Sequence, residues 1–126
     1  MTNSTEHASP LAGLRILLVE DEMALAMALE TLLKTMEARA LKAARVEKAL
    51  TLIEREPLDG ALVDINLGGT PGYPVAAELD RRGIPFVFMT GYHQSAIAEP
   101  WRDRPVLSKP FDDAQLERVA ATTFRC

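Results

Sequence analysis

The sequence has little cysteine: Cys126 is the only one, and it is the last of 126 residues. One terminal cysteine cannot form a disulfide within the chain, and it cannot supply a cysteine metal site. Proteins without disulfides are typical of a reducing compartment, so we expect a cytoplasmic protein.

Long apolar runs and runs of basic residues are also missing. No stretch reaches the roughly 20 apolar residues that a helix needs to cross a bilayer, and residues 1–10 lack the basic and apolar parts of a secretion signal. The 14 Lys and Arg residues are scattered among 18 Asp and Glu residues, and the net charge is −4. We therefore expect neither nucleic acid nor a membrane as a partner.

The length and the 48% hydrophobic content suit one domain with one core. We predict a flexible N-terminal tail over residues 1–12 and a single folded domain over residues 13–126. His7 and His93 have no spaced metal-ligating or catalytic partners, so we interpret both as surface residues.

Short continuous apolar runs alternate with segments of helical periodicity along the chain. Such runs are typical of strands buried on both faces, and the segments between them place apolar residues on one helical stripe. The pattern predicts an α/β fold, a doubly wound five-stranded parallel sheet in the order 2-1-3-4-5 with helices on both faces. We expect strands at 14–19, 39–43, 60–64, 85–90 and 105–108, and helices at 22–36, 46–56, 73–82 and 112–123.

Two segments fit this pattern poorly. Residues 39–43 favour a helix by propensity because of their alanines, although the alternation places an edge strand there. Residues 93–104 contain Pro100, Trp101 and several charges. We expect any helix in that segment to be short, and we expect its face to report the state of the protein.

Polar and ionisable residues follow most of the expected strands directly. In an open parallel sheet, ligands bind at the carboxyl ends of the strands, where the strand order reverses. The first and third strands are neighbours there, so Asp21 and Asp64 should lie side by side. The residues at these ends are Glu20, Asp21 and Glu22 after the first strand, Asp64 after the third, Thr90 and Gly91 after the fourth, and Lys109 and Pro110 after the fifth.

Several carboxylates in one crevice raise one another's pKa unless a cation neutralises them. Oxygen ligands favour a hard divalent cation, and we predict Mg²⁺, or Mn²⁺ in its place. A carboxylate is a nucleophile that forms aspartyl phosphates, and we assign this role to Asp64. The ammonium of Lys109 and the hydroxyl of Thr90 are expected to stabilise the phosphoryl oxygens.

Four segments resemble the signature blocks of response-regulator receiver domains of the CheY type, and the resemblance spans nearly the whole chain. It implies the flavodoxin-like fold described above. With no output domain attached, the chain is similar to single-domain regulators. The segments are 16–22 (ILLVEDE), 61–66 (ALVDIN), 86–91 (FVFMTG) and 106–111 (VLSKPF).

The resemblance also implies a role for each residue of the crevice. Asp64 is the phosphoacceptor, Thr90 supplies the switch hydroxyl, and Lys109 contacts the phosphoryl group. A cis peptide bond is expected between Lys109 and Pro110. The implied metal ligands are Glu20, Asp21, Asp64 and the backbone carbonyl of Asn66.

The function implied is that of a single-domain response regulator in a two-component phosphorelay. Asp64 would receive a phosphoryl group from a sensor histidine kinase or a histidine phosphotransfer protein, and a changed surface would alter binding to an unidentified downstream protein. We do not expect the chain to be an enzyme, except that it assists its own phosphorylation and dephosphorylation. The alternatives are a receiver that keeps the fold without phosphorylation and a phosphate sink without output of its own. The sequence predicts no oligomeric state.

The sequence departs from the family pattern at two places. Val106 stands where the family often has an aromatic switch residue, and we hypothesise that Tyr92 or the 93–104 segment replaces it. Residues 67–72 (LGGTPG) stand where many receivers carry a Met-Pro pair, so we expect a more flexible loop there.

Functions of other classes fit the same residues less well. A flavodoxin-like cofactor binder would need a phosphate cradle after the first strand, where three carboxylates stand instead. A Mg²⁺-dependent phosphatase would want an acid/base carboxylate two residues beyond its nucleophile, at the position of Asn66. The acidic triplet alone also suits the positive end of a helix, so only the joint placement of the strand-end residues favours a phosphoacceptor.

Overall fold

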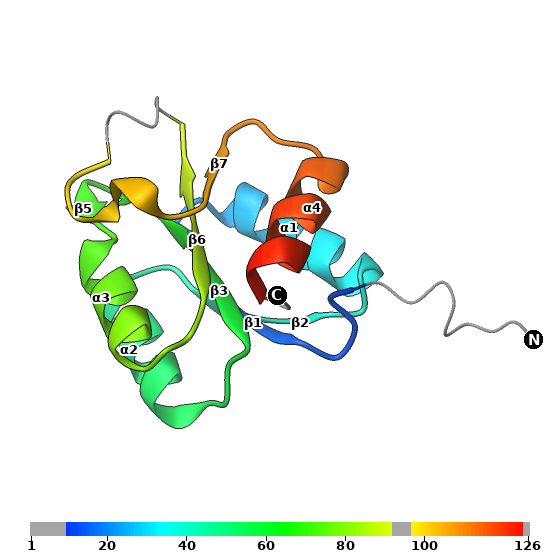
Figure 1. Cartoon of the computed structure of the whole chain (residues 1–126), viewed down its shortest axis with the longest axis horizontal. Helices are drawn as coiled ribbons and strands as arrows, with labels where there is room; N and C mark the ends of the chain where they lie inside the picture. Colours follow the sequence, from blue (N-terminus) through cyan, green and yellow to red (C-terminus); the bar gives the residue numbers. More distant parts are fainter. Residues whose placement is uncertain (1–9, 92–96, 125–126) are drawn as a thin grey trace, which may run out of the picture.

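The computed structural model describes residues 10–91 and 97–124 of the chain. These residues form a parallel sheet with helices on both faces (Figure 1). The strands of the sheet are β1 (Arg15–Val19), β2 (Arg39–Ala43), β3 (Gly60–Asp64), β6 (Phe86–Thr90) and β7 (Val106–Ser108). The α-helices are α1 (Met23–Thr35), α2 (Val46–Arg55), α3 (Tyr73–Arg81) and α4 (Asp113–Phe124).

The strand order of the sheet is β2-β1-β3-β6-β7, and every neighbouring pair is parallel. This confirms the predicted doubly wound order. The uncertain segment 39–43 is indeed an edge strand, and its five residues pair one to one with β1. Pairing with a buried neighbour outweighs the helical propensity of its alanines.

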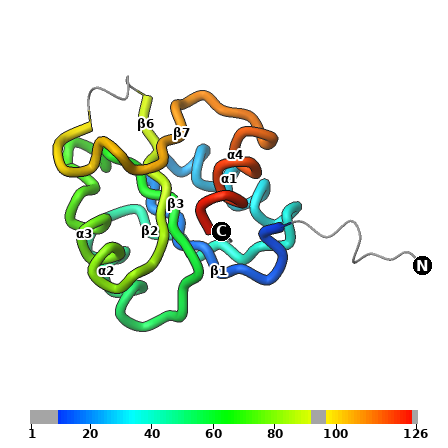
Figure 2. Tube along the Cα trace, in the orientation of Figure 1, coloured from blue at the N-terminus to red at the C-terminus, as the bar shows by residue number. Residues whose placement is uncertain are grey.

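The helices pack in pairs, and each pair buries one face of the sheet (Figure 2). Leu29 and Leu33 of α1 lie with Leu116 of α4 in one apolar layer, and Ile53 of α2 lies with Leu79 of α3 in the other. Because β3 is buried along its whole length, polar groups can collect only at the strand ends. No helix within the described ranges has the length and apolar character needed to span a bilayer.

The loop after β3 contains a structure that the sequence did not predict. Two short strands, β4 (Asn66–Leu67) and β5 (Thr70–Pro71), pair antiparallel and form a hairpin. Gly68 and Gly69 form its tip with φ angles of 61° and 93°. These positive values favour glycine, which explains the Gly-Gly pair in the sequence.

Two predicted regions lie partly outside the described residues. The tail predicted over 1–12 is described only from residue 10, where a turn buries Leu11 completely, so the core begins before residue 13. Of residues 93–104, those described include a 3₁₀ helix over Trp101–Asp103, which agrees with the expectation that any helix there is short. Tyr92 lies outside the described residues. We call residues 97–104 the aromatic segment.

Candidate functional site

The carboxyl end of the sheet collects the buried polar side chains. Among the described residues, only Glu20, Asp64 and Thr90 are polar and buried, with 3%, 5% and 2% of their surface exposed. They stand at or just after the ends of β1, β3 and β6. Because burying a polar group is costly unless it is paired, this concentration marks a functional site.

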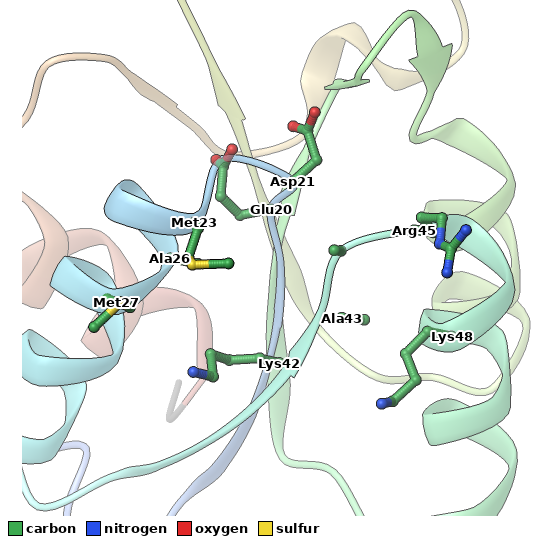
Figure 3. A pocket seen from close by; sticks show the side chains of 10 residues that line it. Glu20, Asp21, Met23, Ala26, Met27, Lys42, Ala43, Arg45 and Lys48 are labelled. Atoms are coloured by element: carbon green, nitrogen blue, oxygen red, sulfur yellow. The ribbon is translucent and has the colours of Figure 1, made fainter.

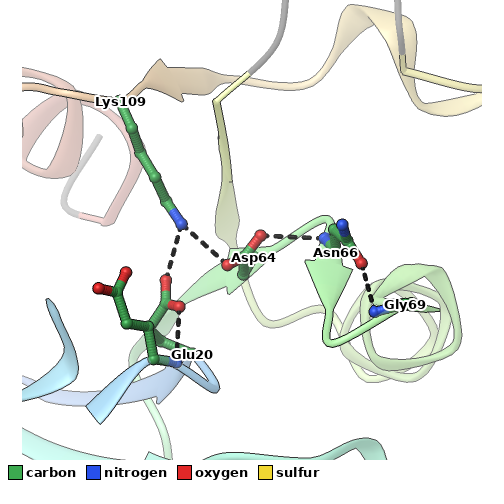
Figure 4. A network of polar contacts seen from close by, with 6 residues as sticks. Glu20, Asp64, Asn66, Gly69 and Lys109 are labelled. Carbon is green, nitrogen blue, oxygen red and sulfur yellow. Dashed lines mark hydrogen bonds and ion pairs between the residues drawn. The ribbon is translucent and has the colours of Figure 1, made fainter. Parts of the chain in front are cut away.

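Lys109 links two of these groups. Its Nζ atom lies 2.9 Å from Glu20 Oε1 and 2.9 Å from Asp64 Oδ2 (Figure 4). Its backbone N–H donates to the carbonyl of Thr90 at 2.7 Å, and its peptide bond to Pro110 is cis, as the resemblance implies. The predicted convergence of Lys109 with the carboxylates is thus present in the structure.

Backbone N–H groups hold the remaining oxygens of the two buried carboxylates. Asn66 N–H donates to Asp64 Oδ1 at 2.9 Å, and Glu22 N–H donates to Glu20 Oε2 at 3.0 Å. The side chain of Asn66 is used elsewhere, since its Oδ1 accepts a hydrogen bond from Gly69 N–H in the hairpin. Both carboxylates are therefore oriented by fixed donors, and the hairpin is tied to the same loop.

Burial and charge shift the pKa values of this cluster. Burial raises the pKa of Glu20 above its ordinary 4.5, and the hydrogen bonds from Lys109 and Glu22 N–H only partly offset it. Burial lowers the pKa of Lys109, but hydrogen bonds to Asp64 and Glu20 outweigh it and the net pKa lies above the ordinary 10.5. A single ammonium serves carboxylates that repel each other, which favours a further cation.

Glu20, Asp21 and Asp64 can each direct one carboxylate oxygen to a common point. Those three oxygens lie within 4.8 Å of one another. Asp21 is exposed, and its Oδ2 would lie 3.1 Å from a Cβ at Gly68, so it stands beside the hairpin tip. Oxygen donors of this kind, two buried and one open to water, fit Mg²⁺, which keeps several water ligands. The roles of the Asn66 carbonyl and the Thr90 hydroxyl stay predictions.

A groove of about 370 Å³ opens beside Glu20 and Asp21, between α1, β2 and α2 (Figure 3). Met23 and Met27 of α1 line it, and their side chains are 75% and 55% exposed. Its other lining includes the cations Lys42, Arg45 and Lys48. The groove thus adjoins two of the three carboxylates, with methionines of α1 on one side and cations of residues 42–48 on the other.

Gly72 packs closely on the backbone of Asp64, the phosphoacceptor candidate. This role was not predicted from the sequence. A Cβ at Gly72 would overlap the carbonyl oxygen of Asp64, and its N–H donates to Ile65 O at 2.7 Å. The Pro71-Gly72 pair before α3 was the available signal. The start of α3 is therefore packed directly on the backbone of Asp64.

Comparisons with known proteins identify the family of this chain. The model of the response regulator receiver domain family matches residues 16–121. The regulatory protein VanR of Enterococcus faecium is 32% identical over 78 residues, which cover 61% of this chain and 34% of VanR. The chain thus matches about a third of the length of that relative.

Solved structures share the fold. SdrG from Sphingomonas melonis is 40% identical, with a TM-score of 0.77, over 90% of this chain and 96% of SdrG. The receiver domain of a sensor histidine kinase from Pseudomonas aeruginosa, solved with a magnesium ion in its active site cleft, is 26% identical, with a TM-score of 0.75. That match covers 91% of this chain and all of that domain. With its strand order and the 16–121 match, this chain belongs to the response regulator receiver domain family of two-component signalling.

Proposed function

We propose that Asp64 accepts a phosphoryl group from a phosphohistidine and that the chain acts as a single-domain response regulator. The donor is the histidine of a sensor kinase or of a phosphotransfer protein. The observation that carries the proposal is the bridge from Lys109 to Glu20 and Asp64, since it places an ammonium beside a buried carboxylate in an otherwise acidic crevice.

The transfer is proposed to be a single displacement. An oxygen of the Asp64 carboxylate bonds to phosphorus while the bond from phosphorus to the donor nitrogen breaks, and that nitrogen keeps the electron pair. Lys109, whose raised pKa keeps it protonated at neutral pH, then pairs with the phosphoryl oxygens. The hydroxyl of Thr90, at the end of β6, is proposed to donate to the same group.

The metal ion has a defined place in this proposal. Glu20, Asp21 and Asp64 would hold it, together with the backbone carbonyl of Asn66, because they offer hard oxygen ligands at one point. When bound, Mg²⁺ neutralises charge on the phosphoryl oxygens. The magnesium in the receiver domain from Pseudomonas aeruginosa supports this assignment.

The chain is proposed to act through binding and to turn over no separate substrate. Water would attack the phosphoryl group slowly and return Asp64 to its carboxylate form. Phosphorylation would shift the equilibrium between two conformations of a surface that a downstream protein recognises. A receiver that had lost phosphorylation would have no need for the paired charges of Glu20, Asp64 and Lys109 in a buried crevice.

The test is phosphoryl incorporation from acetyl phosphate in the presence of Mg²⁺. The intact mass of the wild-type chain should increase by one phosphoryl group, and Asp64→Asn should show no increase. Asp103→Asn is the matched control, because Asp103 is an exposed aspartate of the 3₁₀ helix, and it should behave as the wild type. A mass gain that persists in Asp64→Asn would refute the assignment.

A further inference from the structure

Aromatic side chains attach the aromatic segment to the sheet. The ring of Trp101 meets Phe86 at 6.0 Å and Phe88 at 6.1 Å between centroids, both edge to face. The Arg104 guanidinium lies over the rings of Phe86 and Trp101, and it pairs with Asp80 of α3 at 2.8 Å. The ring pairs, the cation–π contacts and the exposed ion pair each contribute a modest energy.

Tyr73, the first residue of α3, makes the hydrogen bond that joins this segment's backbone to α3. Its hydroxyl oxygen accepts from Ala98 N–H at 2.8 Å. Its ring meets Phe88 edge to face at 5.9 Å, so the same side chain touches both β6 and the aromatic segment. Among the described residues, no other hydrogen bond runs from the backbone of that segment to α3.

The position of Tyr73 is tied to Asp64. Gly72 precedes Tyr73, and its Cα packs so closely on the Asp64 carbonyl that no side chain fits. Its N–H also bonds to Ile65, the residue after Asp64. A displacement of the backbone around Asp64 therefore has to move the first turn of α3, and the Tyr73 hydroxyl with it.

The expected aromatic switch position cannot do this work. Val106 is half-buried against the layer formed by α2 and α3. A valine side chain has neither a ring nor a hydroxyl with which to exchange partners. A coupling between the crevice and the aromatic segment has to use other atoms.

We propose that Tyr73 is a positioning residue that couples the aromatic segment to the phosphoacceptor. The contact between its hydroxyl and Ala98 N–H holds the segment in one arrangement, and phosphorylation of Asp64 shifts the balance away from it. The inference rests on the proposed phosphorylation. A single exposed hydrogen bond contributes little net energy, so a small displacement is enough to change the populations.

Trp101 provides the readout, because it is the only tryptophan of the chain and lies in the aromatic segment. Emission of the full chain is recorded before and after acetyl phosphate with Mg²⁺, and intact mass is measured on the same samples. The wild type should show a mass gain and a change in emission. Tyr73→Phe should keep the mass gain, but its emission before phosphorylation should already lie closer to that of the phosphorylated wild type, because the population ratio shifts about fivefold, the equivalent of one net hydrogen bond. The phosphorylation-dependent change in emission should therefore be smaller than in the wild type.

Thr51→Val is the control variant. It also removes one hydroxyl hydrogen bond, from Thr51 to Glu47 O on α2, but it leaves the aromatic segment untouched. Its emission change should equal that of the wild type. A full change in Tyr73→Phe would overturn the coupling, and so would a wild-type mass gain without any emission change. An absent wild-type mass gain would instead overturn the phosphoacceptor proposal, and the coupling with it.

Discussion

Two ion-pair clusters in this molecule have similar distances and opposite consequences. In the crevice, Glu20 meets Lys109 at 2.9 Å, and the glutamate side chain is 1% exposed. On the outer face of α3, Glu78 meets Arg81 and Arg82, each at 2.6 Å, and it is 24% exposed. Burial raises the pKa of Glu20. The hydrogen bonds from Arg81 and then Arg82 lower the pKa of Glu78 to about 2.

The comparison shows that burial, more than the ion pair itself, distinguishes the functional cluster. Water screens the charges on α3, and such surface pairs contribute little. In the crevice, burial leaves the Glu20 carboxylate under an energetic penalty that a bound cation would relieve. The buried cluster is therefore the one whose stability should depend on a bound cation.

The largest effect is expected from removing the ammonium group of Lys109 in the crevice. Lys109→Met should slow phosphoryl incorporation from acetyl phosphate about 100-fold, because the developing charge on the phosphoryl oxygens loses its ammonium partner. Initial rates of the intact-mass gain measure this effect. Lys34→Met, at an exposed site in the last turn of α1, should leave the rate unchanged. Equal rates for the two variants would remove the distinction between buried and exposed cations.

A smaller effect is expected from disturbing the close packing of Gly72 on the backbone of Asp64. Gly72→Ala should lower the free energy of unfolding by about 2 kcal/mol, because the added methyl overlaps the Asp64 carbonyl. The φ of Gly72 is −85°, so backbone conformation adds no further cost. Urea denaturation measures the loss. Gly91→Ala, where a Cβ meets nothing within 4 Å, is the control, and a similar loss there would contradict the explanation.

The smallest effect concerns the pH dependence of stability, to which Glu20 and Glu78 contribute with opposite signs. The raised pKa of Glu20 contributes stability below 4.5 that is lost as pH rises through the folded-state value. The lowered pKa of Glu78 contributes stability above 4.5 that is lost as pH falls toward 2. Without divalent cations at neutral pH, Glu20→Gln should raise the melting temperature slightly and Glu78→Gln should lower it slightly. Shifts of the same sign in thermal melts would break the comparison.

Much of the fold and site followed from local patterns. The apolar alternation predicted the strand order, and the strand order placed Asp21 near Asp64. At the start of the last helix, Asp112 and Gln115 exchange hydrogen bonds at 2.9 Å and 2.8 Å, a cap formed by residues three positions apart. The hairpin at 66–71 was missed because each of its strands has only two residues, too few to show a period.

The sequence by itself determined the order of elements and the side chains at the strand ends, because both depend on residues that are neighbours along the chain. Only the tertiary structure decided that Lys109 bonds Glu20, 89 positions away, and that Tyr73 accepts from Ala98, 25 positions away. Such contacts depend on how the helices and loops pack on the sheet. Periodicity describes one element at a time, so it contains no information on the distance between side chains of two elements.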